Sequence, residues 1–179
     1  GNPVGGRITI YRNAPNGGVN VNMASTVPAV ASVPAIVTVP AGLNTATFDV
    51  TTTGVANSQT VDISATYLGL TRTVTLTVIP ARLYSLSFIP TVVSGGTDIS
   101  GKVQLDGGAP NGIGVTVALT ADNPAVTVPA TVVILPQTSS IQFPATTLFV
   151  AANTSVNITA QYAGDTRTAV VDVLRANLI

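Results

Sequence analysis

The sequence contains neither histidine nor cysteine. Without them the chain has no imidazole base, no thiolate nucleophile, and no nitrogen or sulfur ligand for a metal ion. A disulfide framework is excluded as well, although the redox compartment stays open. The remaining chemistry would have to come from oxygen ligands and carboxylates.

Charged side chains are also scarce, at 8% of the residues against about 25% in ordinary soluble domains. The seven acids are all aspartates, and they are scattered, so no pair is spaced for acid–base catalysis and no loop offers a set of calcium ligands. The net charge is zero and no basic cluster occurs, which argues against nucleic-acid binding. We therefore expect no enzyme, no cofactor and no metal.

Long apolar runs and large aromatic surfaces are missing too. Runs such as Val132-Val133-Ile134-Leu135 are far shorter than the roughly 20 residues of a membrane-spanning helix. Tryptophan is absent and aromatic residues make up 4% of the chain, so a carbohydrate-binding platform has few side chains to use. We expect no membrane span, and whether carbohydrate is bound stays open.

An internal repeat dominates what is present. Ser58 to Val78 returns as Asn153 to Val173, 95 positions later and without a gap, and Tyr67 returns as Tyr162. Apolar and polar residues alternate with period two on either side of a glycine-containing turn, which predicts a β-hairpin with one buried face and one solvated face.

The rest of the chain repeats as well. The turn sequence Ala-Pro-Asn-Gly occurs at 14–17 and 109–112, and Pro-punctuated segments follow that belong at sheet edges or corners. Short strands and turn signals about every ten residues predict an all-β fold of two tandem immunoglobulin-like β-sandwiches with Greek-key connections. We place the domains at residues 1–79 and 80–179. The junction, 78–83, has no Gly or Ser spacer, which favours a rigid end-to-end arrangement.

The alternation also predicts the core. We expect the apolar residues of the hairpins and two matched phenylalanines to point inward, while Thr73 and Thr75 point to solvent. Tyr67 and Tyr162 are either corner tyrosines, whose hydroxyls bind backbone, or rings that fill the sheet end. The predicted core residues are Phe48, Val61, Ile63, Val74 and Leu76 in the first copy and Phe143, Val156, Ile158 and Val171 in the second.

Two weaker signals have plain interpretations. The threonine ladder within 71–77 could contact ice or carbohydrate, but its second copy contains Val170 and Asp172, so a solvated strand face is favoured. The stretches 153–155 and 157–159 match the N-glycosylation pattern. Asparagine is common in this chain, so chance explains these matches.

The repeats begin at different points. Gly1 corresponds to Gly96, so the first copy has no counterpart of the alternating strand at 82–90. The chain ends with residues 174–179, which align with 79–84 and resemble the start of another such strand. Either the sequence is a segment of a longer tandem array, or the gap is filled by another subunit. The candidate inter-subunit strand is Ala176, Asn177, Leu178 and Ile179.

The ordered motifs resemble those of tandem Ig-like repeats in bacterial cell-surface and secreted proteins. They comprise AP-x-G-G-V, the Pro-Ala-Val and Val-Pro-Ala segments, A-T-F-x-V-T-T and the hairpin. The second copy departs from the pattern at Leu148, Phe149 and Val150, which are more apolar than a solvated loop and form a candidate exposed contact. The resemblance implies a secreted or surface location and no particular ligand.

These observations favour a structural subunit or module of an extracellular appendage, filament or surface layer. Its expected partners are further copies, bound head to tail, or neighbouring Ig-like domains. The alternative is a spacer or ligand-binding Ig-like module of a secreted adhesin or a polysaccharide-acting enzyme.

Overall fold

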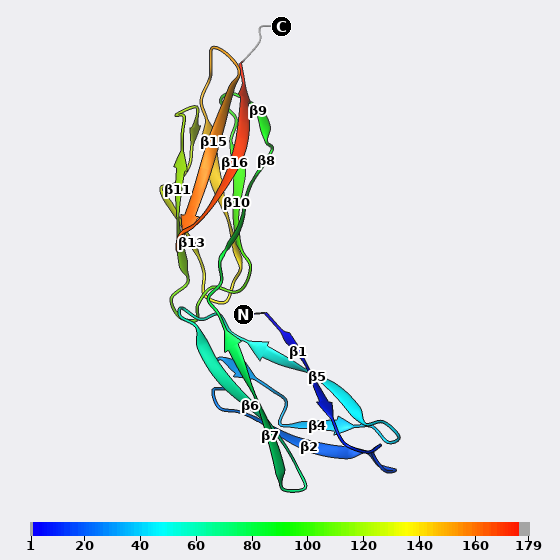
Figure 1. Ribbon diagram of the computed structural model, residues 1–179. Helices are drawn as coiled ribbons and strands as arrows, with labels where there is room; N and C mark the ends of the chain where they lie inside the picture. The colour runs from blue at the N-terminus through cyan, green and yellow to red at the C-terminus, as the bar shows by residue number, and fades with distance from the viewer. Residues whose placement is uncertain (1, 176–179) are drawn as a thin grey trace. The chain divides into compact units, whose positions relative to one another are not determined.

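The computed structural model describes residues 2–175, and the chain divides into two compact units, residues 1–80 and 81–179. Every regular element of the described residues is a β-strand (Figure 1). The first unit contains β1 (Val4–Thr9), β2 (Val19–Ser25), β3 (Ala31–Ser32), β4 (Ile36–Val39), β5 (Thr45–Thr52), β6 (Gln59–Tyr67) and β7 (Leu70–Val78). The second contains β8 (Leu83–Ile89), β9 (Val92–Ser94), β10 (Ile99–Leu105), β11 (Val115–Ala121), β12 (Val126–Thr127), β13 (Thr131–Ile134), β14 (Ser140–Thr147), β15 (Thr154–Tyr162) and β16 (Asp165–Leu174).

Each unit is a pair of sheets with non-sequential strand orders. The first unit has the orders β1-β5-β3 and β4-β2-β6-β7, and the second has β12-β14-β10-β8 and β13-β11-β15-β16-β9. The crossovers between the two sheets of a unit make each an Ig-like β-sandwich, as the sequence predicts. The Pro-punctuated strands β3, β4, β12 and β13 all lie at sheet edges, where a missing backbone donor costs little.

The repeated hairpin forms in both units. Strands β6 and β7 pair from Gln59↔Val78 to Tyr67↔Leu70, and β15 and β16 pair from Thr154↔Val173 to Tyr162↔Asp165. Each turn has two residues with positive φ, namely Leu68 and Gly69 in one and Ala163 and Gly164 in the other. Two-residue turns of this kind match the twist of the flanking strands, and glycine adopts positive φ without strain.

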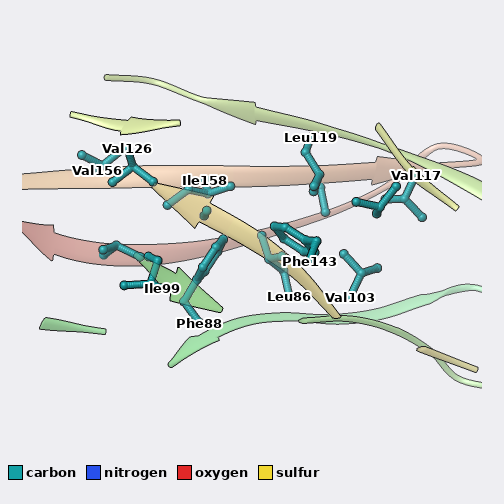
Figure 2. Close-up of a cluster of buried hydrophobic side chains, with 14 of the residues drawn as sticks. Leu86, Phe88, Ile99, Val103, Val117, Leu119, Val126, Phe143, Val156 and Ile158 are labelled. Carbon is teal, nitrogen blue, oxygen red and sulfur yellow. The ribbon is translucent and has the colours of Figure 1, made fainter. Parts of the chain in front are cut away.

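The second unit has one continuous core. Val156, Ile158 and Val171 are fully buried, and Phe143 is nearly so, which confirms their predicted inward direction. Figure 2 shows the side chains of Phe88 on β8 and Phe143 on β14 within this core. Their rings meet edge to face, with centroids 5.8 Å apart. An edge-to-face contact suits the ring quadrupoles and adds to the burial of apolar surface.

The core of the first unit is divided into two clusters. Val61 is fully buried, whereas Phe48, Ile63 and Leu76 are only partly buried. Val74 was predicted to be buried, and this prediction is wrong, since its side chain is 71% exposed. Its counterpart in the repeat, Ala169, packs against the core of the second unit, where β8 packs against β16. The first unit has no strand in that place among the described residues.

Candidate functional site

The described residues offer little for catalysis or metal binding. Residues 2–175 contain no group of three or more acidic, His or Cys side chains that could hold a metal ion. Within the same residues, no helix has the length and apolar character needed to cross a membrane.

One aspartate has a clearly shifted pKa, and its role is structural. The side-chain amide of Asn157 donates to Asp122 at 2.7 Å, and the Asn157 backbone N–H donates to the same carboxylate at 2.9 Å. These bonds favour the ionised form and hold the pKa of Asp122 below its usual range. In the first unit, Thr26 accepts the equivalent bond from the backbone N–H of Asp62, at 2.9 Å. Both contacts join the end of one strand to its neighbour.

An open groove lies in the first unit. It has a volume of about 720 Å³ and lies between the free edges of β1 and β7. We call it the β1–β7 groove. Most of the side chains that line it are apolar, namely Val4, Ile8, Ile10, Val19, Val21, Met23, Phe48, Val50, Ile63, Ala65, Leu70, Val74 and Leu76.

Both walls of the groove end in unpaired strand edges. Among the described residues, β1 pairs only with β5 and β7 pairs only with β6. The equivalent strands of the second unit each have one more neighbour, because β8 pairs with β10 and β9 pairs in parallel with β16. A free edge presents backbone N–H and C=O groups that can bind another strand.

Burial differs between the units at the positions that face this groove. Val4 is 40% exposed, whereas its counterpart Ile99 is 5% exposed. Ile10 is partly buried and its counterpart Leu105 is almost completely buried. The groove is therefore the place that β8 and β9 fill in the second unit.

The rim of the groove carries positive charge. Arg7, Arg12 and Arg72 line it, and no aspartate does. The counterpart of Arg72 is Arg167, whose Nε donates to the backbone carbonyl of Tyr84 on β8 at 2.9 Å. Arg72 thus has the position at which Arg167 binds the backbone of β8 in the second unit.

The residues that the sequence suggested as contacts have different places. The candidate strand at 176–179 lies outside the described residues. Leu148 and Phe149 are exposed, at 53% and 79%, while Val150 packs against the core. The ring of Phe149 lies over Gly96, where a Cβ would come within 2.6 Å of it. The rings of Tyr67 and Tyr162 pack against their cores, which agrees with the plainer of their two interpretations.

Sequence reasoning predicted that residues 1–79 contain no counterpart of the strand at 82–90, but it did not identify the residues that line the groove. The sequence pattern alone does not identify Gly6, Arg72 and Val74 as groove residues. The available signal was the alignment of the copies, because each of these positions matches a residue beside β8 in the second unit.

Several solved structures are similar to this chain. The D0-D1 domain of intimin is 15% identical, with 97% of this chain and 90% of that chain covered and a TM-score of 0.39. Domains 4 and 5 of the S-layer protein SbsC are 21% identical, with 86% and 70% covered and a TM-score of 0.39. Invasin, a bacterial integrin-binding protein, is 14% identical, with 98% of this chain but only 40% of that chain covered and a TM-score of 0.49. No protein-family model and no curated protein sequence matches the chain.

Proposed function

We propose that the chain is a structural module of an extracellular appendage, filament or surface layer, joined to a neighbouring subunit by a strand donated into the β1–β7 groove. The observation that carries the proposal is the groove itself, in which two free strand edges flank an apolar floor. Strand addition satisfies such edges through main-chain hydrogen bonds, while alternate side chains enter the groove. A catalytic role has no support from the side chains of residues 2–175.

The segment 176–179 is the candidate for the start of the donated strand. In the repeat alignment Leu178 matches Leu83, which is fully buried in the second unit. Leu178 of one subunit would then lie against Ile10 of the next, since Leu83 pairs with Leu105, the counterpart of Ile10. Such a contact joins two different surfaces, and successive copies therefore add head to tail without closing, which produces a filament.

Sedimentation velocity over a range of protein concentrations tests this proposal. We expect the full chain to form larger species as the concentration rises, and a chain that lacks residues 175–179 to sediment as a monomer. Leu178→Asp should act like the deletion, because it places a charge in an apolar site. A deletion that leaves assembly unchanged would show that this tail is not the donor, and a full chain that stays monomeric would favour the spacer function.

A further inference from the structure

We infer that the β1–β7 groove is a selective site for a strand with the side-chain pattern of β8 and β9, in which an aromatic ring is seated on Gly6. The occupant is a segment of a neighbouring subunit, so this inference rests on the function proposed above and adds the sequence class that the groove recognises. In the second unit, β8 and β9 occupy the equivalent groove, so their contacts show what such a strand binds.

The register of the occupant follows from the second unit. Strand β8 runs antiparallel to β10, with Leu86 opposite Val103 and Phe88 opposite Gly101. The counterparts of Val103 and Gly101 in the first unit are Ile8 and Gly6, both on β1. A bound strand therefore runs antiparallel to β1, with one inward residue over Ile8 and the next over Gly6.

The aromatic position is defined by glycine and phenylalanine together. A Cβ on Gly101 would lie 2.3 Å from the Phe143 ring and 2.8 Å from the Phe88 ring, so only glycine lets both rings reach the strand. A Cβ on Gly6 would lie at the same distance, 2.3 Å, from the Phe48 ring, and its three nearest atoms among the described residues all belong to that ring. Phe143 is 4% exposed, whereas Phe48 is half-buried and lines the groove. Residues 2–80 thus contain the counterpart of Phe143, which is Phe48, but no residue that aligns with Phe88.

The opposite wall provides backbone contacts. In the second unit, the Asp172 N–H donates to the Thr91 carbonyl at 2.8 Å, and the Gly95 N–H donates to the Leu174 carbonyl at 3.0 Å. The counterpart of Asp172 is Thr77, on β7, and the counterpart of Leu174 is Ile79, the residue after the end of β7. Together with Arg72, they form a second edge that a strand crossing from β1 to β7 can bind.

The pattern requires a longer strand than residues 176–179. In the repeat alignment that tail reaches only the positions of Leu83 and Tyr84. The inward positions of Leu86, Phe88 and Val93 lie further along the strand, and all three are buried in the second unit. The complete occupant therefore carries apolar residues at these positions and a ring at the position of Phe88.

The test uses the full chain and a synthetic peptide with the sequence of residues 81–95, measured by isothermal titration calorimetry. We expect saturable one-to-one binding, whereas a scrambled peptide of the same composition should not bind. Val74→Asp should weaken binding at least tenfold, because the charge lies beneath the docked strand. Val74 is mostly exposed, so this substitution leaves the fold intact. The matched control is Val170→Asp on β16, where Val170 is 49% exposed in the other unit.

A second arm tests the ring. A peptide with Phe88→Ala should bind at least tenfold more weakly than the unchanged peptide, and amide chemical-shift changes in the full chain should include Gly5 and Gly6. The inference is overturned if the unchanged peptide does not bind, if Val74→Asp leaves its affinity unaltered, or if the Phe88→Ala peptide binds equally well. It is also overturned if a peptide of residues 174–179 binds more tightly than that of residues 81–95.

The two proposals can fail separately. If the peptide binds as expected while the full chain stays monomeric, the groove accepts this strand class but the chain does not assemble through its own tail. If the chain assembles and the peptide neither binds nor competes, the subunits meet through another surface.

Discussion

At the scale of single residues, the two units use the same apolar positions differently. Ile158 is completely buried, whereas its counterpart Ile63 is only partly buried beside the groove. Both follow the same alternation in the sequence, and both point into their sandwich. The difference comes from whether another strand covers the side chain, and not from the strand to which the residue belongs.

We expect Ile158→Ala to lower the free energy of unfolding by about 2–5 kcal/mol, because it leaves a cavity in a closed core. Ile63→Ala should cost clearly less, since its site already opens on the groove. Calorimetric unfolding of the two full-length variants measures this difference. Equal losses would mean that the groove is closed in solution.

Asp122 predicts a pH dependence of stability. Its pKa is lowered in the folded state, chiefly by the hydrogen bond from the Asn157 side chain. The carboxylate therefore contributes stability that is fully present above its unfolded pKa, about 3.9, and is lost as the pH falls through the lower folded pKa. The group is fully exposed, so the effect is small.

We expect Asp122→Thr, which introduces the residue type that the first unit uses at Thr26, to reduce the acid sensitivity of the second unit. Unfolding should be followed between pH 2 and pH 6 for the full chain and the variant. The stability difference between them should be constant above about pH 5 and shrink below about pH 4. A difference that does not vary with pH would show that the carboxylate charge is not involved.

At the scale of elements, β1 and β10 are equivalent strands with unequal surroundings. Strand β10 lies between β14 and β8, while β1 has β5 on one side and the groove on the other. Close packing around β10 leaves no room for an inserted methyl group. Beside β1, the ring of Phe48 can move into the groove.

This contrast makes Gly6 and Gly101 a matched pair. Gly101→Ala should lower the melting temperature of the second unit, because its Cβ meets both the Phe143 and the Phe88 ring. Gly6→Ala should change that of the first unit much less, because its Cβ meets the Phe48 ring, which lines the open groove. Differential scanning calorimetry of the full chain resolves the two effects. Equal shifts would argue that the Phe48 ring is as confined as that of Phe143.

At the scale of the whole molecule, each unit has its own sheets and core. One continuous core buries more apolar surface than two partial clusters, and the apolar area removed from water is the main favourable term in folding. The second unit should therefore be the more stable of the two.

We expect residues 81–179, produced alone, to fold with an all-β circular dichroism spectrum and to melt at a higher temperature than residues 1–80. Adding the peptide of residues 81–95 should raise the melting temperature of residues 1–80, because a ligand that binds only the folded state stabilises it. An unfolded or helical second unit would contradict the two-sandwich fold.

The amino-acid sequence alone predicts the fold class, the repeat and the hairpins. Period-two alternation around short turns depends only on local geometry, and β6–β7 and β15–β16 form where it predicts them. Within residues 1–80, the 95-residue repeat aligns no segment with β8.

Which residues line the β1–β7 groove depends on how the two sheets of the first unit pack. Alternation assigns Val74 to the inner face of β7, and that face becomes a core only if another strand covers it. Burial at Val74, Ile63 and Phe48 therefore depends on a segment remote from β7 in the chain. For the same reason, the pattern of neither strand predicts that Arg167 binds the Tyr84 carbonyl, 83 residues away. Nor does it predict that Arg72 has the equivalent position on the rim of an open groove.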